Sequence, residues 1–478
     1  MLFNSLEFAV FFPFTTALFL LTPLAWRWLP LLIMSSVFYM AFVPAYILIL
    51  IVTIVVDYAA GLIIEASQGR TRRLSLIVSV VVNVSFLAFF KYWNFLNENL
   101  AALFGAAHLR YPVPLLTIAL PIGLSFHIFQ SLSYTIEVYR GNQKAERHFG
   151  IYALYVMFYP QLVAGPIERP QNLLHQFHAP RAFDAERAAL GLQRMLWGFF
   201  KKVVVADRLA AMVDVVYDNP TSFTGAPLIA ATLAFTVEIY CDFSGYSDIA
   251  LGAAQVMGYE LMENFSRPYF ATSVSEFWSR WHRSLSTWFR DYLYIPLGGN
   301  RVSLGLWIRN TVIVFALSGL WHGASWTFVV WGFLHAAFLV AGRLKDKALA
   351  GKVAAPRFLK WLATVGLVAF AWIFFRAHTL REARYITAHL FQGLPAQLHS
   401  PRSLWLAVRA LGQPDDLLLG VLFTGLLFGV EALQSRGSLR ARLAAQPLVV
   451  RWGLLYACMF TTILFGVFRH HAFIYFQF

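Results

Sequence analysis

The sequence places an imidazole inside a long apolar run. Residues 317–326 (LSGLWHGASW) set His322 between Trp321 and Gly323. Charged types at membrane depth cost roughly 2.5–3.5 kcal/mol on insertion scales, and titratable residues there usually face a cavity or a partner. A neutral imidazole is also a suitable general base near neutral pH. Two interpretations therefore stay open, a catalytic base or a histidine that hydrogen-bonds between helices.

A second histidine lies in a stretch with two distinct faces, residues 275–290. The three tryptophans there recur at steps of three and seven along one stripe, and His282 shares another stripe with serines and an arginine. This pattern predicts one amphipathic helix that ends before Pro296. The helix is either an interfacial anchor with tryptophan at the headgroups, or a basic wall for an anionic thioester donor. The candidate donor-binding residues are Trp278, Arg280 and Arg283.

Three carboxylates follow one another in residues 236–249, at Glu238, Asp242 and Asp248. Glu238 and Asp242 share a helix face at i, i+4 spacing, where two negative charges repel unless a cation or a proton intervenes. We expect an arginine from a neighbouring helix, because buried charges are normally paired. A metal is the alternative, but no further oxygen ligand recurs at regular spacing, so we predict no metal site.

The composition predicts an integral membrane protein. Of 478 residues, 59% are hydrophobic and only 13% are charged, against about 25% charged in soluble domains. The net charge of +14 is scattered over short loops, which fits the positive-inside rule and contact with membrane lipid rather than with nucleic acid. Cys241 and Cys458 have apolar neighbours and are expected to be core thiols. We see no removable signal peptide.

Hydropathy and loop charge predict the topology. The basic segments 68–73, 140–148, 342–360 and 434–451 are placed in the cytoplasm, which puts both termini outside. The segment 376–413 does not fit this topology, because it would lie outside the cytoplasm although it carries five arginines. The expected spans are 8–25, 31–42, 45–64, 74–90, 112–138, 359–375, 417–433 and 453–468.

Simple hydropathy fails between residues 149 and 304, where apolar residues alternate with charged residues and prolines. Polar backbone at membrane depth is tolerated only inside protein or along a cavity. We therefore expect re-entrant and partly buried inner helices in this part. Pro160 should stop a helix before a Gly165-Pro166 turn, and Glu168 and Arg169 are expected to solvate the loop that follows.

Several long segments together resemble the membrane-bound O-acyltransferases, in particular the bacterial polysaccharide branch whose type member acetylates alginate. Relatives acting on alginate, cellulose, peptidoglycan and teichoic acid share these segments, so the acceptor stays open. The matching segments are 158–167 (FYPQLVAGPI), 242–248 (DFSGYSD), 278–301 (WSRWHRSLSTWFRDYLYIPLGGNR), 319–326 (GLWHGASW) and 473–478 (FIYFQF).

The resemblance implies one all-α polytopic domain over residues 1–478, a bundle of about 11–13 helices around a central tunnel. We divide it into N-terminal helices (1–148), a catalytic core (149–341), and C-terminal helices with an aromatic tail (342–478). A bacterial inner membrane location and a multi-pass arrangement follow from the resemblance.

The same resemblance implies that His322 is the catalytic histidine and that His282 is a second active-site residue. An alcohol is a weak nucleophile at neutral pH, so acyl transfer to a hydroxyl needs such a base. Trp321 and Trp326 are expected to wall the site, Asp242 to contribute to binding, and His282 to stabilise the oxyanion. His335, thirteen residues after His322, falls on a different helix face and is expected to be structural.

The aromatic tail resembles segments proposed to carry the acyl group on tyrosine, which makes Tyr475 a possible relay; the alternative is a membrane-interface anchor. We expect no bound cofactor and acetyl-CoA as the acyl donor. The expected partners are a periplasmic Ser/His hydrolase-like acetyltransferase of the SGNH type and a surface polysaccharide. The predicted function is O-acetylation of that polysaccharide with a cytoplasmic acetyl thioester. The alternatives are a long-chain lipid or protein acyltransferase, and a non-enzymatic transporter.

Overall fold

The computed structural model describes residues 1–118, 120–163, 165–179, 182–348, 355–437, 442–443, 445–468 and 473–474. Helices make up the regular structure of this part, which contains no strand. Two short apolar helical segments (Leu6–Leu21 and Leu24–Met40) join eight that are long and apolar enough to cross a membrane. The prediction of an all-α polytopic membrane protein is confirmed. The eight are Pro44–Ala66, Gly69–Ala106, Ala226–Val256, Leu304–His322, Trp326–Ala348, Arg357–Arg376, Pro414–Ser435 and Leu448–Phe465.

The chain divides into two compact units. The first comprises Met1–Met195 and Ile249–Glu263, and the second comprises Leu196–Asp248 and Asn264–Phe478. The chain passes between the units three times, within α10 (Ala185–Phe199), within α12 (Ala226–Val256) and between Glu263 and Asn264. The expected three-part division of one domain and the central tunnel stay predictions.

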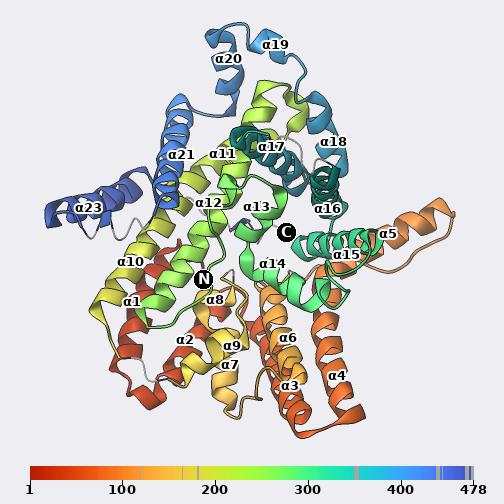
Figure 1. Cartoon of the computed structure of the whole chain (residues 1–478), viewed down its shortest axis with the longest axis vertical. Helices are drawn as coiled ribbons and strands as arrows, with labels where there is room; N and C mark the ends of the chain where they lie inside the picture. The colour runs from red at the N-terminus through yellow and green to blue at the C-terminus, as the bar shows by residue number, and fades with distance from the viewer. Residues whose placement is uncertain are drawn as a thin grey trace. The chain divides into compact units, whose positions relative to one another are not determined.

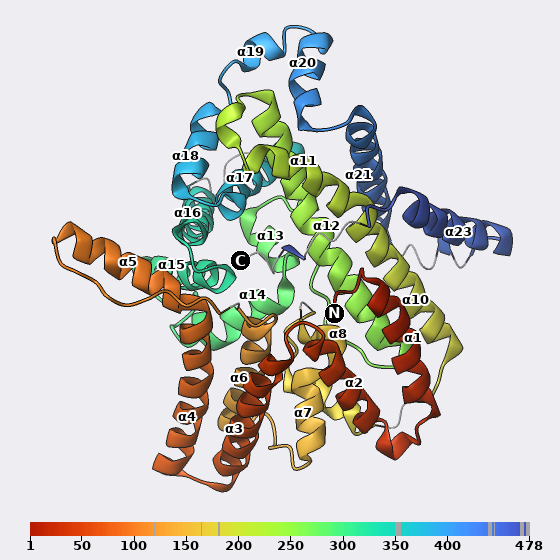
Figure 2. The same cartoon turned by 180° about the vertical axis from the view of Figure 1, so that it is seen from behind.

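In the first unit, three helices lie side by side around a buried polar cluster (Figures 1 and 2). The carboxylate of Asp57 accepts hydrogen bonds from the Ser79 hydroxyl at 2.6 Å and from the Asn83 amide at 2.9 Å. These bonds satisfy an acidic side chain within an apolar helix. The helices are α3 (Ile47–Ala66), α4 (Gly69–Leu87) and α6 (Leu124–Arg140); others in this unit are α1 (Leu6–Leu21), α2 (Trp28–Met40), α5 (Trp93–Ala106), α7 (Phe149–Met157), α8 (Tyr159–Leu162) and α9 (Pro170–Leu173).

The chain turns after Pro160 as expected, but the side chain of Glu168 is not exposed to solvent as we expected. α7 ends at Met157 and α8 is a single turn. Glu168 is fully buried and accepts hydrogen bonds from the Met262 backbone N–H at 2.5 Å and the Asn172 amide at 2.6 Å. The prediction that Glu168 solvates a loop is therefore wrong, because it bonds two segments of the first unit together.

The second unit is built on helices that approach each other closely. α15 (Leu304–His322), α16 (Trp326–Ala348) and α17 (Arg357–Arg376) pack in series (Figure 1). A Cβ added at Gly332 of α16 would collide with the carbonyl oxygen of Phe315 on α15. Small residues permit such contact between membrane helices. Other elements of this unit are the π-helix η5 (Phe200–Ala206), α11 (Asp207–Tyr217), α13 (Val274–Arg280), α14 (Arg283–Phe289), α18 (Leu380–His389), α20 (Pro401–Val408), α21 (Pro414–Ser435) and α23 (Leu448–Phe465).

The structure departs from two of the sequence expectations and gives a partner to one arginine of the segment 376–413. The span expected at 112–138 is helical only from Leu124, because three prolines precede it. The continuous helix expected over 275–290 is wrong: it is two helices, α13 and α14, broken at Trp281-His282. Arg376 in the arginine-rich segment is buried and paired with Asp214 at 2.7 Å. Cys241 and Cys458 are free thiols, the first buried and the second half-buried.

Candidate active site

His322 stands at a break between two membrane helices. It is the last residue of α15, and Gly323 continues in extended backbone before α16 begins at Trp326. His322 is buried, with only 3% of its surface exposed. Close to His322, α15 and the start of α16 lie in tight contact, because a Cβ added at Gly319 would collide with the Phe328 carbonyl oxygen. The fold therefore fixes this imidazole at a buried helix end.

His282 stands at the other break, between α13 and α14. Its backbone is left-handed, with φ 40° and ψ 54°, although it is not glycine. Such conformations cost on the order of 1–3 kcal/mol and persist only where neighbours hold them. The backbone N–H of Arg283 donates to the Asn264 carbonyl at 2.9 Å, and that of Ser284 donates to Asn264 Oδ1 at 3.3 Å. Asn264 thus holds the strained residue from outside its own helix.

The two histidines are neighbours in space. Their ring centroids are 6.4 Å apart, with an interplanar angle of 60°. His282 is 0% exposed, and burial lowers its pKa to about 3, so the ring is neutral at physiological pH. The fold thus brings together two buried imidazoles that are 40 positions apart in the sequence.

Asn264 determines which nitrogen of neutral His282 carries the proton. Asn264 Oδ1 lies 3.4 Å from His282 Nδ1 and also accepts the Ser284 hydroxyl at 2.6 Å. Because the Ser284 donors identify this atom as the amide oxygen, it can only accept. The hydrogen bond therefore requires the proton on Nδ1 and leaves a lone pair on Nε2.

An aromatic shell surrounds His322. The rings of Trp321, Trp331 and Phe375 lie edge-on to it, with centroids at 5.0, 5.0 and 5.4 Å. Trp331 is fully buried, and its far side meets His335 at 4.9 Å. Such a shell excludes bulk water, which would otherwise compete as a nucleophile.

His335 belongs to the wall behind Trp331. Its Nδ1 accepts a hydrogen bond from Trp278 Nε1 at 3.2 Å, and the two rings are 5.0 Å apart. Trp331 contacts both His335 and His322, and no ring contact joins those two histidines directly among the described residues. Trp278, a predicted donor-binding residue, is placed with His335 rather than with His322.

Asp242 of α12 contacts both a lysine and the backbone of Ile474. Its carboxylate lies 2.6 Å from Lys202 Nζ and accepts the Ile474 backbone N–H at 2.8 Å. Lys202 also pairs with Asp207 at 2.7 Å. Burial would lower the pKa of Lys202, but the two carboxylates outweigh it and raise that pKa. The cation beside Asp242 is thus a lysine of η5, whereas the arginine expected for the Glu238 and Asp242 pair acts on Glu238 and is Arg376.

Phe473 and Ile474 are connected to His282 through the ring of Phe243. Phe473 and Ile474 are buried, and the Phe473 ring packs against Tyr246 at 4.6 Å and Phe243 at 5.7 Å. The Phe243 ring in turn lies 4.6 Å from the His282 ring. Tyr475, the possible relay, follows Ile474 in the sequence and lies outside the described residues.

Three other predicted residues are placed away from the histidine pair. Trp326 begins α16 with 52% of its surface exposed. Arg280 pairs with Glu276 one turn earlier on α13, at 2.5 Å. Arg283 is exposed at the start of α14. Among the described residues, no group of three or more histidine, cysteine or acidic side chains is arranged to hold a metal.

Sequence reasoning missed Asn264, Lys202 and Phe375 as parts of this site. Lys201 and Lys202 interrupt an apolar run, 196–206, and buried cations require partners, so a signal for Lys202 was present. Asn264 and Phe375 carry no such signal, because an asparagine in a loop and a phenylalanine in a membrane helix are common.

Comparison with known proteins supplies the family. The model of the membrane-bound O-acyltransferase family matches residues 117–381, more than half of the chain and all of the histidine site. The chain belongs to the membrane-bound O-acyltransferase family. It is 42% identical to a probable alginate O-acetylase, AlgI, of Pseudomonas aeruginosa, over 80% of this chain and 73% of that protein.

Two further proteins that are similar to this chain are named for other acceptors. A peptidoglycan O-acetyltransferase of Helicobacter pylori is 36% identical over 74% of this chain and 71% of its own length. A teichoic acid D-alanyltransferase of Bacillus subtilis is 26% identical over 47% of this chain and 60% of its own. The chain is therefore a multi-pass membrane O-acyltransferase, and the transporter interpretation falls away.

Proposed function

We propose that this membrane-bound O-acyltransferase takes an acetyl group from a cytoplasmic thioester, acetyl-CoA, for O-acetylation of an extracytoplasmic polysaccharide. The acceptor is an alginate-like exopolysaccharide, cellulose or peptidoglycan. Relatives named as O-acetylases of alginate and of peptidoglycan support the acetyl group and the polymer. The observation that carries the chemistry is the neighbouring pair of buried imidazoles, His282 and His322, in an aromatic shell.

His322 acts as the general base in this proposal. Its imidazole takes the proton of the attacking hydroxyl as that oxygen bonds to the thioester carbonyl carbon. The tetrahedral intermediate then collapses, the C–S bond breaks, and the thiolate takes the proton to leave as a thiol. General base catalysis contributes typically 10²–10⁴-fold. The surrounding tryptophans keep water from hydrolysing the thioester.

His282 acts as a hydrogen-bond acceptor beside the reaction. With its proton on Nδ1 toward Asn264, its Nε2 accepts from a hydroxyl and cannot donate to an oxyanion. This differs from the oxyanion role that we expected for His282. The single proton of the attacking hydroxyl goes to His322, so the donor to His282 Nε2 is another O–H or N–H group of the bound substrates. His282 is then a positioning residue.

Tyr475 is proposed as the first acceptor. Ile474, the residue before it, is held by Asp242, and Phe473 packs near His282. The phenol oxygen would take the acetyl group as an ester and pass it to the serine of a periplasmic hydrolase-like acetyltransferase. That partner, an inner-membrane location and termini outside the cytoplasm belong to the same proposal.

Replacing His322 with glutamine tests the base. Glutamine is close in size but cannot accept a proton, so ester-linked acetate on the surface polymer should fall at least 10²-fold. Acetate released from purified polymer, measured by mass spectrometry, gives the result and also distinguishes acetyl from longer acyl groups. Membrane abundance of H322Q serves as the control. Normal acetate content in H322Q would reject the mechanism, and a long acyl group would reject the acetyl donor.

Replacing Tyr475 with phenylalanine tests the relay separately. The ring that packs or anchors is kept, and only the hydroxyl is lost. We expect acetylation of the polymer to fall to the level of H322Q, with no acetyl ester recovered on C-terminal peptides. Full acetylation in Y475F would sink the relay and leave the His322 mechanism intact.

A further inference from the structure

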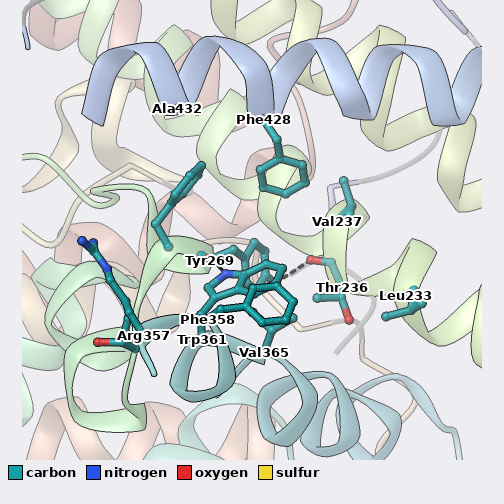
Figure 3. Close-up of a pocket in the computed structure, with 12 residues that line it drawn as sticks. Leu233, Thr236, Val237, Tyr269, Arg357, Phe358, Trp361, Val365, Phe428 and Ala432 are labelled. Atoms are coloured by element: carbon teal, nitrogen blue, oxygen red, sulfur yellow. Dashed lines mark hydrogen bonds between the residues drawn. The ribbon is translucent and has the colours of Figure 1, made fainter. Parts of the chain in front are cut away.

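The second unit contains an apolar pocket apart from the histidines. Its volume is about 690 Å³, within the range of roughly 300–1,000 Å³ typical of ligand sites. It lies between α12, η7 (Pro268–Phe270) with Thr272 after it, α17 and α21 (Figure 3). Leu233 and Phe358, at 50% and 63% exposure, stand on its lining. All three helices are candidate membrane spans, so the pocket borders lipid.

The polar groups in the pocket wall are already satisfied. The Tyr269 hydroxyl donates to the Thr236 carbonyl at 2.5 Å and accepts from Trp372 Nε1 at 3.2 Å. Trp361 Nε1 donates to the Tyr269 carbonyl at 2.7 Å. The wall therefore presents carbon to an occupant, except at one end of the pocket, where Arg357 lies away from Leu233 and Thr236 (Figure 3).

The contacts that lead from the pocket to His322 pass through two tryptophan rings. Trp372, bonded to Tyr269, stacks on Trp331 at 5.8 Å, and Trp331 lies 5.0 Å from His322. An occupant of the pocket is thus separated from the reacting groups by this wall. The pocket is not the place where the acyl group is transferred.

Two cations lie at the start of α17, beside the pocket. Arg357 is the first residue of α17, a candidate span, so its guanidinium stands at headgroup level. Lys360 follows at i+3 on the same helix, where side chains are neighbours. Within the described part of the chain, neither cation forms an ion pair. Cations at the end of a span attract anionic lipid headgroups.

We propose that this pocket binds a phospholipid with an anionic headgroup, one acyl chain lying along Tyr269, Trp361 and Phe428 and the headgroup on Arg357. An anionic lipid is favoured over a zwitterionic one because the latter brings its own cation to a site that already has Arg357. The site is independent of the proposed acetyl transfer.

Native mass spectrometry of the purified full-length chain tests this site with phosphatidylglycerol and phosphatidylcholine of identical acyl chains. We expect one phosphatidylglycerol to bind about five-fold more tightly than phosphatidylcholine, from roughly one neutralised charge at the surface. Arg357→Gln should remove that five-fold preference and leave phosphatidylcholine binding unchanged. The matched control is Arg381→Gln, an exposed arginine on α18, which should bind both lipids as the native chain does.

Ala432→Trp fills the pocket from α21 and should abolish tight binding of both lipids; its melting temperature and monodispersity show whether it is folded. If that variant does not fold, Arg357→Gln decides alone. Equal affinity of the native chain for the two lipids, or unchanged preference in Arg357→Gln, would overturn the proposal. So would displacement of phosphatidylglycerol by a long-chain acyl-CoA, because the pocket would then be a donor site.

Discussion

Replacing Asn264 with aspartate should make the activity depend on pH through His282. Asn264 Oδ1 lies 3.4 Å from His282 Nδ1 and accepts the Ser284 hydroxyl at 2.6 Å. Aspartate keeps an acceptor oxygen in this place and adds a negative charge. At an effective dielectric constant of about 20, a unit charge at this distance is worth about 5 kcal/mol, which corresponds to between three and four pKa units.

In the native protein, burial lowers the pKa of His282 to about 3. The added carboxylate favours the imidazolium and should raise this pKa to between 6 and 7, by about the amount above. Protonated His282 has no lone pair on Nε2, so it can no longer accept a hydrogen bond from a bound substrate. Acetyl transfer by N264D should therefore approach the native rate at pH 8 and fall as the pH drops below about 6.5.

The assay is acetyl transfer by the purified chain in liposomes between pH 5.5 and 8.5, native and variant side by side. Asn264→Ala is the matched control, because it removes the acceptor without adding charge. Its loss should be the same at every pH and come from a misoriented imidazole. A ratio of N264D to native activity that does not change with pH would refute the assigned tautomer and the role of Nε2.

Two further predictions concern the fold. Burial raises the pKa of Glu168 from 4.5 to about 7, so its neutral form stabilises the fold fully below pH 4.5 and this contribution is lost as the pH rises through 7. E168Q should remove a pH dependence of about 3 kcal/mol over that range; equal pH slopes in thermal unfolding of both proteins would contradict it. In Gly332→Ala, the new Cβ meets the Phe315 carbonyl, so stability should fall by about 1–3 kcal/mol and activity with it. In Gly366→Ala a Cβ meets nothing within 4 Å, so this variant should have the melting temperature of the native protein. Equal melting temperatures of the two alanine variants would refute the close contact between α15 and α16.

The membrane helices were the part of the fold most open to prediction. The expected spans 45–64 and 417–433 fall on Pro44–Ala66 and Pro414–Ser435, because a lipid core demands about 20 consecutive apolar residues. The helix expected over 275–290 failed for a different reason. Side-chain periodicity reports which face is apolar, and it carries no information on the backbone angle of a single residue such as His282.

The site was predictable only where a residue type is unusual for its place. His322 stands out because a titratable imidazole in an apolar run is costly and usually faces a cavity or a partner. His282 became a candidate by family resemblance. Asn264 and Phe375 acquire their meaning from contacts with residues 18 and 53 positions away. Nothing local distinguishes them from other loop asparagines and membrane phenylalanines, so three-dimensional contact is the first signal.

The charges on α12 connect these two kinds of information. A lysine in the apolar run 196–206 requires a carboxylate, and Asp242 requires a cation, yet the sequence does not pair them. Once paired at 2.6 Å, Lys202 leaves Asp242 an oxygen that holds the Ile474 N–H at 2.8 Å. The two carboxylate oxygens of Asp242 thus contact η5 and the Ile474 backbone. The position of Ile474, the residue before Tyr475, thus depends on a buried ion pair.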